Sequence, residues 1–129
     1  MDIIEHEGVT LAVIQDGEVI IRETQDALDI MADARYQGAD SVILRAEHLD
    51  PAFFDLKTRL AGEILQKFSN YRMKLAIVGD FSVYNSKSLR DFIFESNKQG
   101  RINFVPSMEE ARVSLSKNLL FNRSHSSQK

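Results

Sequence analysis

Apolar runs of strand length alternate with segments of helical periodicity along most of this chain, and this alternation constrains its fold more than any other feature. Residues 41–44 and 73–78 are compact apolar runs of the kind that is buried on both faces of a parallel sheet. Between such runs, apolar residues recur at helical spacing. Parallel strands that are joined by helices require right-handed crossovers. We therefore predict an α/β fold.

The expected order of elements is strand, strand, helix, strand, helix, strand, helix, strand, helix. At the start we predict a hairpin, in which Asp16 and Gly17 form the turn between strands at residues 9–15 and 19–21. Residues 3–5 are a further candidate strand that would precede residues 9–15 by turning at Gly8. The pattern predicts a mixed, mostly parallel sheet with an N-terminal hairpin.

Capping residues and glycines mark the helix ends. A side-chain oxygen before a helix accepts a backbone amide, and a glycine after it adopts the left-handed conformation that ends the helix. On this basis helices begin after Thr24, Asp50 and Ser107 and end at Gly38 and Gly100.

Apolar positions on the inner faces of these elements define the predicted core. Gly62 interrupts one helical pattern at a cost of about 1 kcal/mol relative to alanine. Close packing of that helix on the sheet is the ordinary explanation, and an opening for a ligand is the alternative. The predicted core consists of Ile43, Leu44, Ile64, Leu65, Phe68, Ile77, Val78, Phe92 and Ile93.

Length and composition limit the class of protein. A chain of 129 residues with 43% hydrophobic and 27% charged residues fits one globular domain. We place this domain at residues 1–115 and expect residues 116–129 to be a polar, partly disordered tail. A net charge of −3 argues against general nucleic-acid binding, and the absence of cysteine excludes disulfides and thiolate sites. An acidic N-terminus and short apolar runs predict a cytoplasmic protein without a membrane span.

Several strings of residues resemble the bacterial domain-of-unknown-function family numbered 4180. The resemblance covers roughly residues 1–115 and implies a fold without an assigned chemistry. The strings are QDALD at 25–29, YQGAD at 36–40, FFDLKT at 53–58, AGEILQKFSNYR at 61–72, LAIVGDF at 75–81 and SKSLRDFI at 86–93.

The element order is similar to that of STAS domains and SpoIIAA-like proteins, which implies a STAS-like single domain. In STAS antagonists, a partner kinase phosphorylates a serine or threonine in the loop that opens the helix after the third strand. Here Asp55 matches the aspartate of that loop motif and Thr58 supplies the only hydroxyl. Lys57 stands near the usual serine, and Arg59 replaces an expected glycine. Thr58 is therefore either a phosphorylation site or a plain helix cap, and we favour the cap.

The carboxyl ends of the parallel strands are where a site is expected in such a sheet. Lys57 and Arg59 could hold an anion or a phosphorylated residue there, together with Thr58, or they could simply form a solvated first turn. His48, Asp80 and Ser86 could be written as a hydrolase triad. The ordinary reading is that serine caps a helix and aspartate forms a turn, because no nucleophile-elbow motif supports the triad.

No cofactor or metal is expected. The histidines at 6, 48 and 125 have no paired spacing, and Gly79 is not followed by a glycine-rich phosphate loop. The absence of catalytic motifs and the element order predict a non-enzymatic regulatory or interaction module that acts through a protein partner or a small anionic ligand.

Two other classes of function stay open. One is a small hydrolase-type enzyme that uses His48, Asp80 and Ser86. The other is a homo-oligomeric protein that associates through its first hairpin and its tail. Residues 119–121 are apolar and would either cover the sheet edge of their own domain or dock on a second subunit.

Overall fold

The computed structural model describes residues 1–15 and 17–116. They form a single α/β domain with a five-stranded sheet. No helix among these residues has the length and apolar character needed to cross a membrane. The predicted tail beyond Ser116 lies outside the described residues. The strands are β1 (Asp2–His6), β2 (Val9–Val13), β3 (Ser41–Arg45), β4 (Lys74–Val78) and β5 (Ile102–Val105), and the helices are α1 (Thr24–Tyr36), α2 (Leu60–Asn70), α3 (Lys87–Gln99) and a further helix that begins at residue 108.

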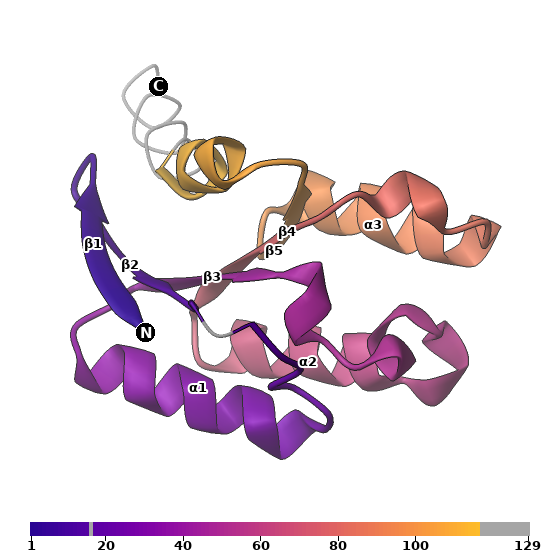
Figure 1. Ribbon diagram of the computed structural model, residues 1–129, viewed down its shortest axis with the longest axis horizontal. Helices are drawn as coiled ribbons and strands as arrows, with labels where there is room; N and C mark the ends of the chain where they lie inside the picture. The colour runs from indigo at the N-terminus through magenta and orange to yellow at the C-terminus, as the bar shows by residue number, and fades with distance from the viewer. Residues whose placement is uncertain (16, 117–129) are drawn as a thin grey trace.

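The strands lie in the sheet in their sequence order, β1-β2-β3-β4-β5 (Figure 1). β1 is antiparallel to β2, and all other neighbours are parallel. This arrangement confirms the predicted mostly parallel sheet. Since each crossover advances by one strand in the same direction, right-handed connections bring α1, α2 and α3 to one face of the sheet.

The N-terminal hairpin is formed by β1 and β2, which confirms the candidate strand at residues 3–5 and its turn at Gly8. The predicted strand partner at residues 19–21 is wrong. The turn consists of Glu7 and Gly8, whose φ angles of 51° and 81° fit a two-residue hairpin turn with positive φ at both positions. The amides of Ile20 and Ile21 instead donate to the carbonyl oxygen of His48 at 2.9 and 3.0 Å. The chain after β2 therefore runs past the end of β3, and Ile21 keeps a single bridge to Leu49.

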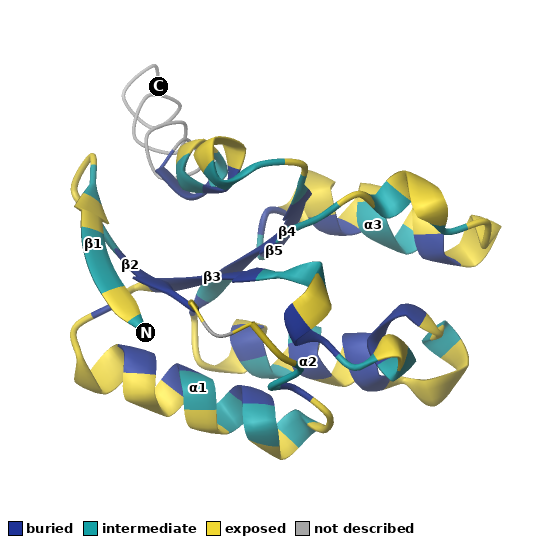
Figure 2. Ribbon diagram, in the orientation of Figure 1, coloured by how far each residue is buried: buried dark blue, intermediate teal, exposed yellow. Residues whose placement is uncertain are grey.

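Both faces of the central strands are buried, which explains why the strands read as continuous apolar runs (Figure 2). Ala12, Leu44 and Ile77 pack in the core beneath α1, α2 and α3. On the opposite face, Ile43 packs with Leu115 of the last helix. Of the predicted core, Ile43, Leu44, Ile64, Phe68 and Ile77 are buried, whereas Leu65, Val78, Phe92 and Ile93 are half-buried and pack against the core.

Two of the predicted helix caps are confirmed. Asp50 Oδ1 accepts the amide of Ala52 at 2.9 Å and starts a short 3-10 helix, Pro51–Phe54. Ser107 Oγ accepts the amide of Glu110 at 3.1 Å at the start of the last helix. In both cases a short polar side chain satisfies a backbone donor that the helix leaves open.

The prediction that Thr24 caps α1 is wrong by one residue. The N-cap is Glu23, whose own amide donates to Asp26 Oδ2 at 3.3 Å, as does the amide of Arg22 at 2.9 Å. The hydroxyl of Thr24 donates to Glu63 Oε1 of α2 at 3.0 Å. The side chain of Thr24 therefore links α1 to α2 and does not form the helix cap that its spacing predicted.

Left-handed residues end the helices, and one of them is not glycine. Gly38 and Gly100 have φ angles of 90° and 84°, as predicted. α2 ends in the same way with Arg72, whose φ is 56°. The amide of Met73 then donates to the carbonyl oxygen of Phe68 at 3.0 Å, as expected for a Schellman motif. Arg72 thus has a backbone conformation that glycine adopts with the least strain.

Candidate functional site

The carboxyl edge of the sheet, where a ligand was expected, contains a cluster of aromatic rings. Phe54 stacks on Tyr84 with ring centroids 4.7 Å apart, and Phe81 meets Phe104 edge to face at 5.2 Å. Phe53 contacts both Phe54 and Phe104. Burial of its ring raises the pKa of the Tyr84 hydroxyl. The protein's own side chains therefore occupy much of the space at these strand ends.

The three residues of the suggested triad have local structural contacts. His48 is buried, and its Nδ1 accepts the amide of Arg45 at 2.9 Å. Asp80 Oδ1 accepts from Oγ and N of Ser82 at 2.6 and 3.1 Å, and these two hydrogen bonds lower the pKa of its carboxyl. Ser86 caps α3 through the amide three residues later. These contacts correspond to the capping and turn roles that were weighed against catalysis.

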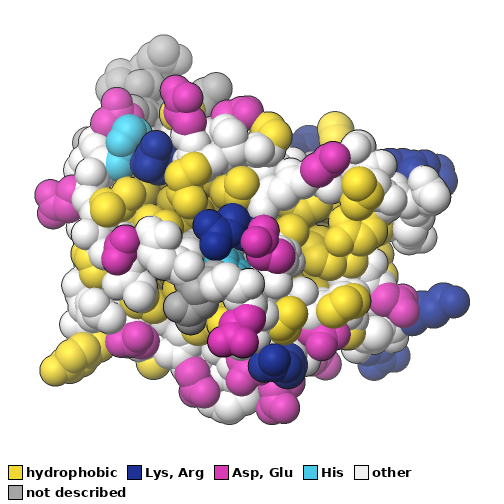
Figure 3. Space-filling view, viewed as in Figure 1, with side chains coloured by type: hydrophobic (Ala, Val, Ile, Leu, Met, Phe, Trp, Pro, Cys, Tyr) yellow, Lys and Arg dark blue, Asp and Glu magenta, His cyan; other side chains and the backbone are white. Residues whose placement is uncertain are grey.

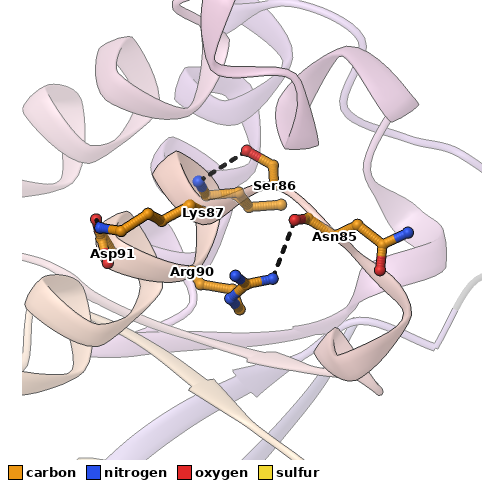
Figure 4. A network of polar contacts seen from close by, with 6 residues as sticks. Asn85, Ser86, Lys87, Arg90 and Asp91 are labelled. Carbon is orange, nitrogen blue, oxygen red and sulfur yellow. Dashed lines mark hydrogen bonds and ion pairs between the residues drawn. The ribbon is translucent and has the colours of Figure 1, made fainter.

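The first turn of α3 combines the cap with two cations (Figure 4). Ser86 Oγ accepts a helix amide at 3.1 Å. Lys87 Nζ lies 2.8 Å from Asp91 Oδ2, so its charge is paired. Arg90 Nη1 donates to the carbonyl oxygen of Asn85 at 3.0 Å, which leaves the other N–H groups of Arg90 without a carboxylate partner among the described residues.

Thr58 is exposed, and its hydroxyl is committed to the backbone of the loop before α2. Its Oγ1 lies 2.6 Å from the carbonyl oxygen of Ala52 and 2.8 Å from that of Asp55, and accepts the amide of Leu60 at 3.3 Å. The N-cap of α2 is Arg59, so the favoured cap assignment is wrong by one position. The predicted commitment of the hydroxyl to backbone groups is confirmed.

We predict that Thr58→Val lowers the free energy of unfolding by about 1 kcal/mol, because the carbonyl oxygens of Ala52 and Asp55 lose the hydroxyl that they share as a donor and the amide of Leu60 loses its acceptor. Thr58→Asp should also destabilise, since a carboxylate cannot donate to these carbonyls. Thr58→Ser keeps the hydroxyl and should stay within about 0.5 kcal/mol of the wild type. Urea unfolding measures all three, and a neutral Thr58→Val would contradict this role.

A groove of about 430 Å³ lies between α2 and α3 and includes one of the predicted site residues, Arg59. Leu56 and Phe92 supply its apolar surface. Gly62 also lines it, and a Cβ at this position would have no heavy atom within 4 Å. The close-packing explanation for Gly62 is therefore wrong, and the glycine marks an opening. We name this feature the α2–α3 groove; its lining is Leu56, Arg59, Gly62, Glu63, Gln66 and Phe92.

Two exposed cations lie at or near the α2–α3 groove, and two nearby carboxylates accept hydrogen bonds from groups of the protein. Asp55 accepts the amide of Lys57 at 3.1 Å, and Glu63 accepts the hydroxyl of Thr24 at 3.0 Å. Lys57 and Arg59 are exposed. Figure 3 shows apolar side chains gathered between α3 and the loop before α2, with Lys and Arg side chains at the outer edges. The sequence predicted the cations but not the groove, because Phe92 was assigned to the core.

The fold and this surface define a small α/β domain in which a helix-connected parallel sheet is extended by an N-terminal hairpin. The model of the family described as Domain of unknown function (DUF4180) matches residues 6–115, and the chain belongs to this family. No curated protein and no solved structure matches the chain.

Proposed function

We propose that this protein is a non-enzymatic regulatory or interaction module that binds a partner protein in the α2–α3 groove. The observation that carries the proposal is the combination of an open apolar groove at Gly62 with an aromatic cluster at the adjacent strand ends. Apolar surface that is rimmed by polar residues is typical of sites for protein interaction.

The chemistry of the groove favours an apolar segment that carries carboxylates. Leu56 and Phe92 offer half-buried apolar surface that a partner's side chains would remove from water. Arg59 projects from the groove margin, and its left-handed φ of 66° costs about 1–2 kcal/mol that a glycine would avoid. A strained residue at a surface groove is consistent with a role in binding.

The STAS-like likeness supports the same class of function by analogy of element order alone. Under this analogy the domain would act in the cytoplasm, and the loop from Asp55 to Arg59 would be the contact region. Two alternatives are a small anion bound at Lys57 and Arg59 and self-association through the hairpin. Each would place the amide shifts of a nuclear magnetic resonance experiment on a different surface.

Nuclear magnetic resonance titration with two synthetic peptides tests the proposal. Both peptides have leucines at the same helical spacing, and their polar positions are glutamate in one and lysine in the other. We expect the glutamate peptide to shift the amides of Leu56, Gly62 and Phe92. Arg59→Glu should weaken its binding about fivefold, equivalent to about 1 kcal/mol. Arg112→Glu should not, because it lies on the last helix, which packs on the opposite face of the sheet.

Equal binding of the lysine peptide, or shifts confined to other surfaces, would overturn the proposal. Native mass spectrometry of the protein purified from its own cells then identifies the natural partner. The wild type and Arg59→Glu are compared, and a bound protein should be present only with the wild type.

A further inference from the structure

A second, larger hollow lies along α1, beside the turn that follows α2. It has a volume of about 530 Å³, within the range of pockets for small molecules. Tyr36 and Tyr71 stand at its margin and are 91% and 55% exposed. Asp29 lines the hollow as well and accepts a hydrogen bond from Gln25 at 2.9 Å. Its apolar lining is Leu28, Met31, Ala32 and Met73.

A polar hollow adjoins this apolar one and shares Arg35 with it. It has a volume of about 270 Å³ and also contains Arg72 and the backbone at Gly38. Its acidic residue, Asp40, accepts the amide of Thr10 at 3.1 Å through Oδ2. The two hollows together offer an apolar surface that leads to a pair of guanidinium groups.

The charges of these two arginines are not compensated by ion pairs. Arg35 Nη2 donates to the carbonyl oxygen of Tyr71 at 2.7 Å, which holds the guanidinium between the ends of α1 and α2. Among the described residues, neither Arg35 nor Arg72 forms an ion pair. Arginine presents several N–H donors in a plane that matches a carboxylate.

Arg72 ends α2 in the conformation for which α1 uses Gly38. Residues with a Cβ are strained in this conformation, because the Cβ lies too close to the following carbonyl oxygen. An arginine at this position therefore lowers the stability of the fold relative to glycine. Its guanidinium lies at the polar hollow.

We propose that the two hollows bind a small amphipathic carboxylate, with its apolar body on Leu28, Ala32 and Tyr71 and its head group between Arg35 and Arg72. The ligand is defined by this chemistry: an apolar chain or ring with one carboxylate at its end. This site is separate from the α2–α3 groove, and the two proposals can fail independently.

Titration with sodium octanoate, followed by nuclear magnetic resonance, tests this inference. We expect saturable shifts at the amides of Gly38, Ala39 and Met73. Octanol, which lacks the charge, and acetate, which lacks the chain, should each bind at least about tenfold more weakly, since each loses one half of the recognition.

Arg72→Gly is the informative variant, because it removes the guanidinium and suits the left-handed backbone. We expect it to raise the melting temperature by about 2–4 °C and to weaken octanoate binding about tenfold. Arg59→Gly is the matched control: it makes the same change at another left-handed arginine and should leave octanoate binding unchanged.

Four results would overturn the inference. The first three are the absence of octanoate shifts at the hollows, equal binding of octanol and octanoate, and unchanged octanoate affinity in Arg72→Gly. Loss of affinity in both glycine variants would assign the effect to net charge and would also overturn it.

Discussion

Phe68→Ala should lower the free energy of unfolding by about 3–5 kcal/mol, the largest effect that we expect from a single substitution in this chain. Phe68 is 1% exposed and packs in the core between α2 and the sheet. Removal of a fully buried ring loses its transfer free energy and leaves a cavity that rigid neighbours fill only in part. Urea unfolding, monitored by circular dichroism, measures the change.

Phe94→Ala is the control for Phe68→Ala. Phe94 is 67% exposed on α3, so its truncation should change the unfolding free energy by less than about 0.5 kcal/mol. Similar values for both variants would show that α2 does not pack on the sheet through the face described above.

Gly79→Ala should destabilise the protein by about 1–3 kcal/mol. A Cβ at Gly79 would lie 2.8 Å from the Cβ of Ala46 and 3.3 Å from Cζ of Phe81. The Cβ of Ala46 is fixed to the backbone, so the contact is relieved only if the backbone at Ala46 or at position 79 shifts. The same unfolding measurement gives the size of this effect.

Gly62→Ala provides the matched comparison with the opposite sign. A Cβ at Gly62 meets no heavy atom within 4 Å, and the residue lies in α2. Alanine there should raise the unfolding free energy by about 0.5–1 kcal/mol, because it loses less backbone entropy in a helix than glycine. A destabilising Gly62→Ala would mean that the α2–α3 groove is closed in solution.

Arg59 and Arg72 link the stability of this domain to its two proposed sites. Each has a positive φ next to a hollow, on opposite ends of α2. Because glycine suits both positions, substitution by glycine separates binding from folding at each one. Each variant also serves as the control for the other.

Local signals in the sequence determined the class of fold and several element ends. The alternation of apolar runs with helical segments predicts the parallel sheet, because the crossover rules leave few other arrangements. Asp50, Ser107, Gly38 and Gly100 were assigned correctly, since each cap or stop depends on backbone groups only a few residues away. The strings between residues 25 and 93 were sufficient to indicate the family.

The sequence indicated two turns, one at Gly8 and one at Asp16 and Gly17, because each turn signal is locally sound. Only the pairing of β2 with β1 and β3, together with the hydrogen bonds from Ile20 and Ile21 to His48, shows that residues 19–21 do not form a strand beside β2. Thr24 shows the same limit. Its spacing fits a cap, yet a glutamate 39 residues later takes its hydroxyl.

The candidate sites depended almost entirely on tertiary structure. A groove or a ring cluster is the outcome of contacts between distant segments, and residue type alone does not report which face of a helix remains open. Gly62 was the one local signal of a site. It fitted either close packing or an opening, and only the open space beside it decides for the opening. The sequence by itself determined the α/β fold, the family and the presence of cations near α2. Only the tertiary structure decided where those cations face, because their surroundings come from α1, α3 and the strand ends.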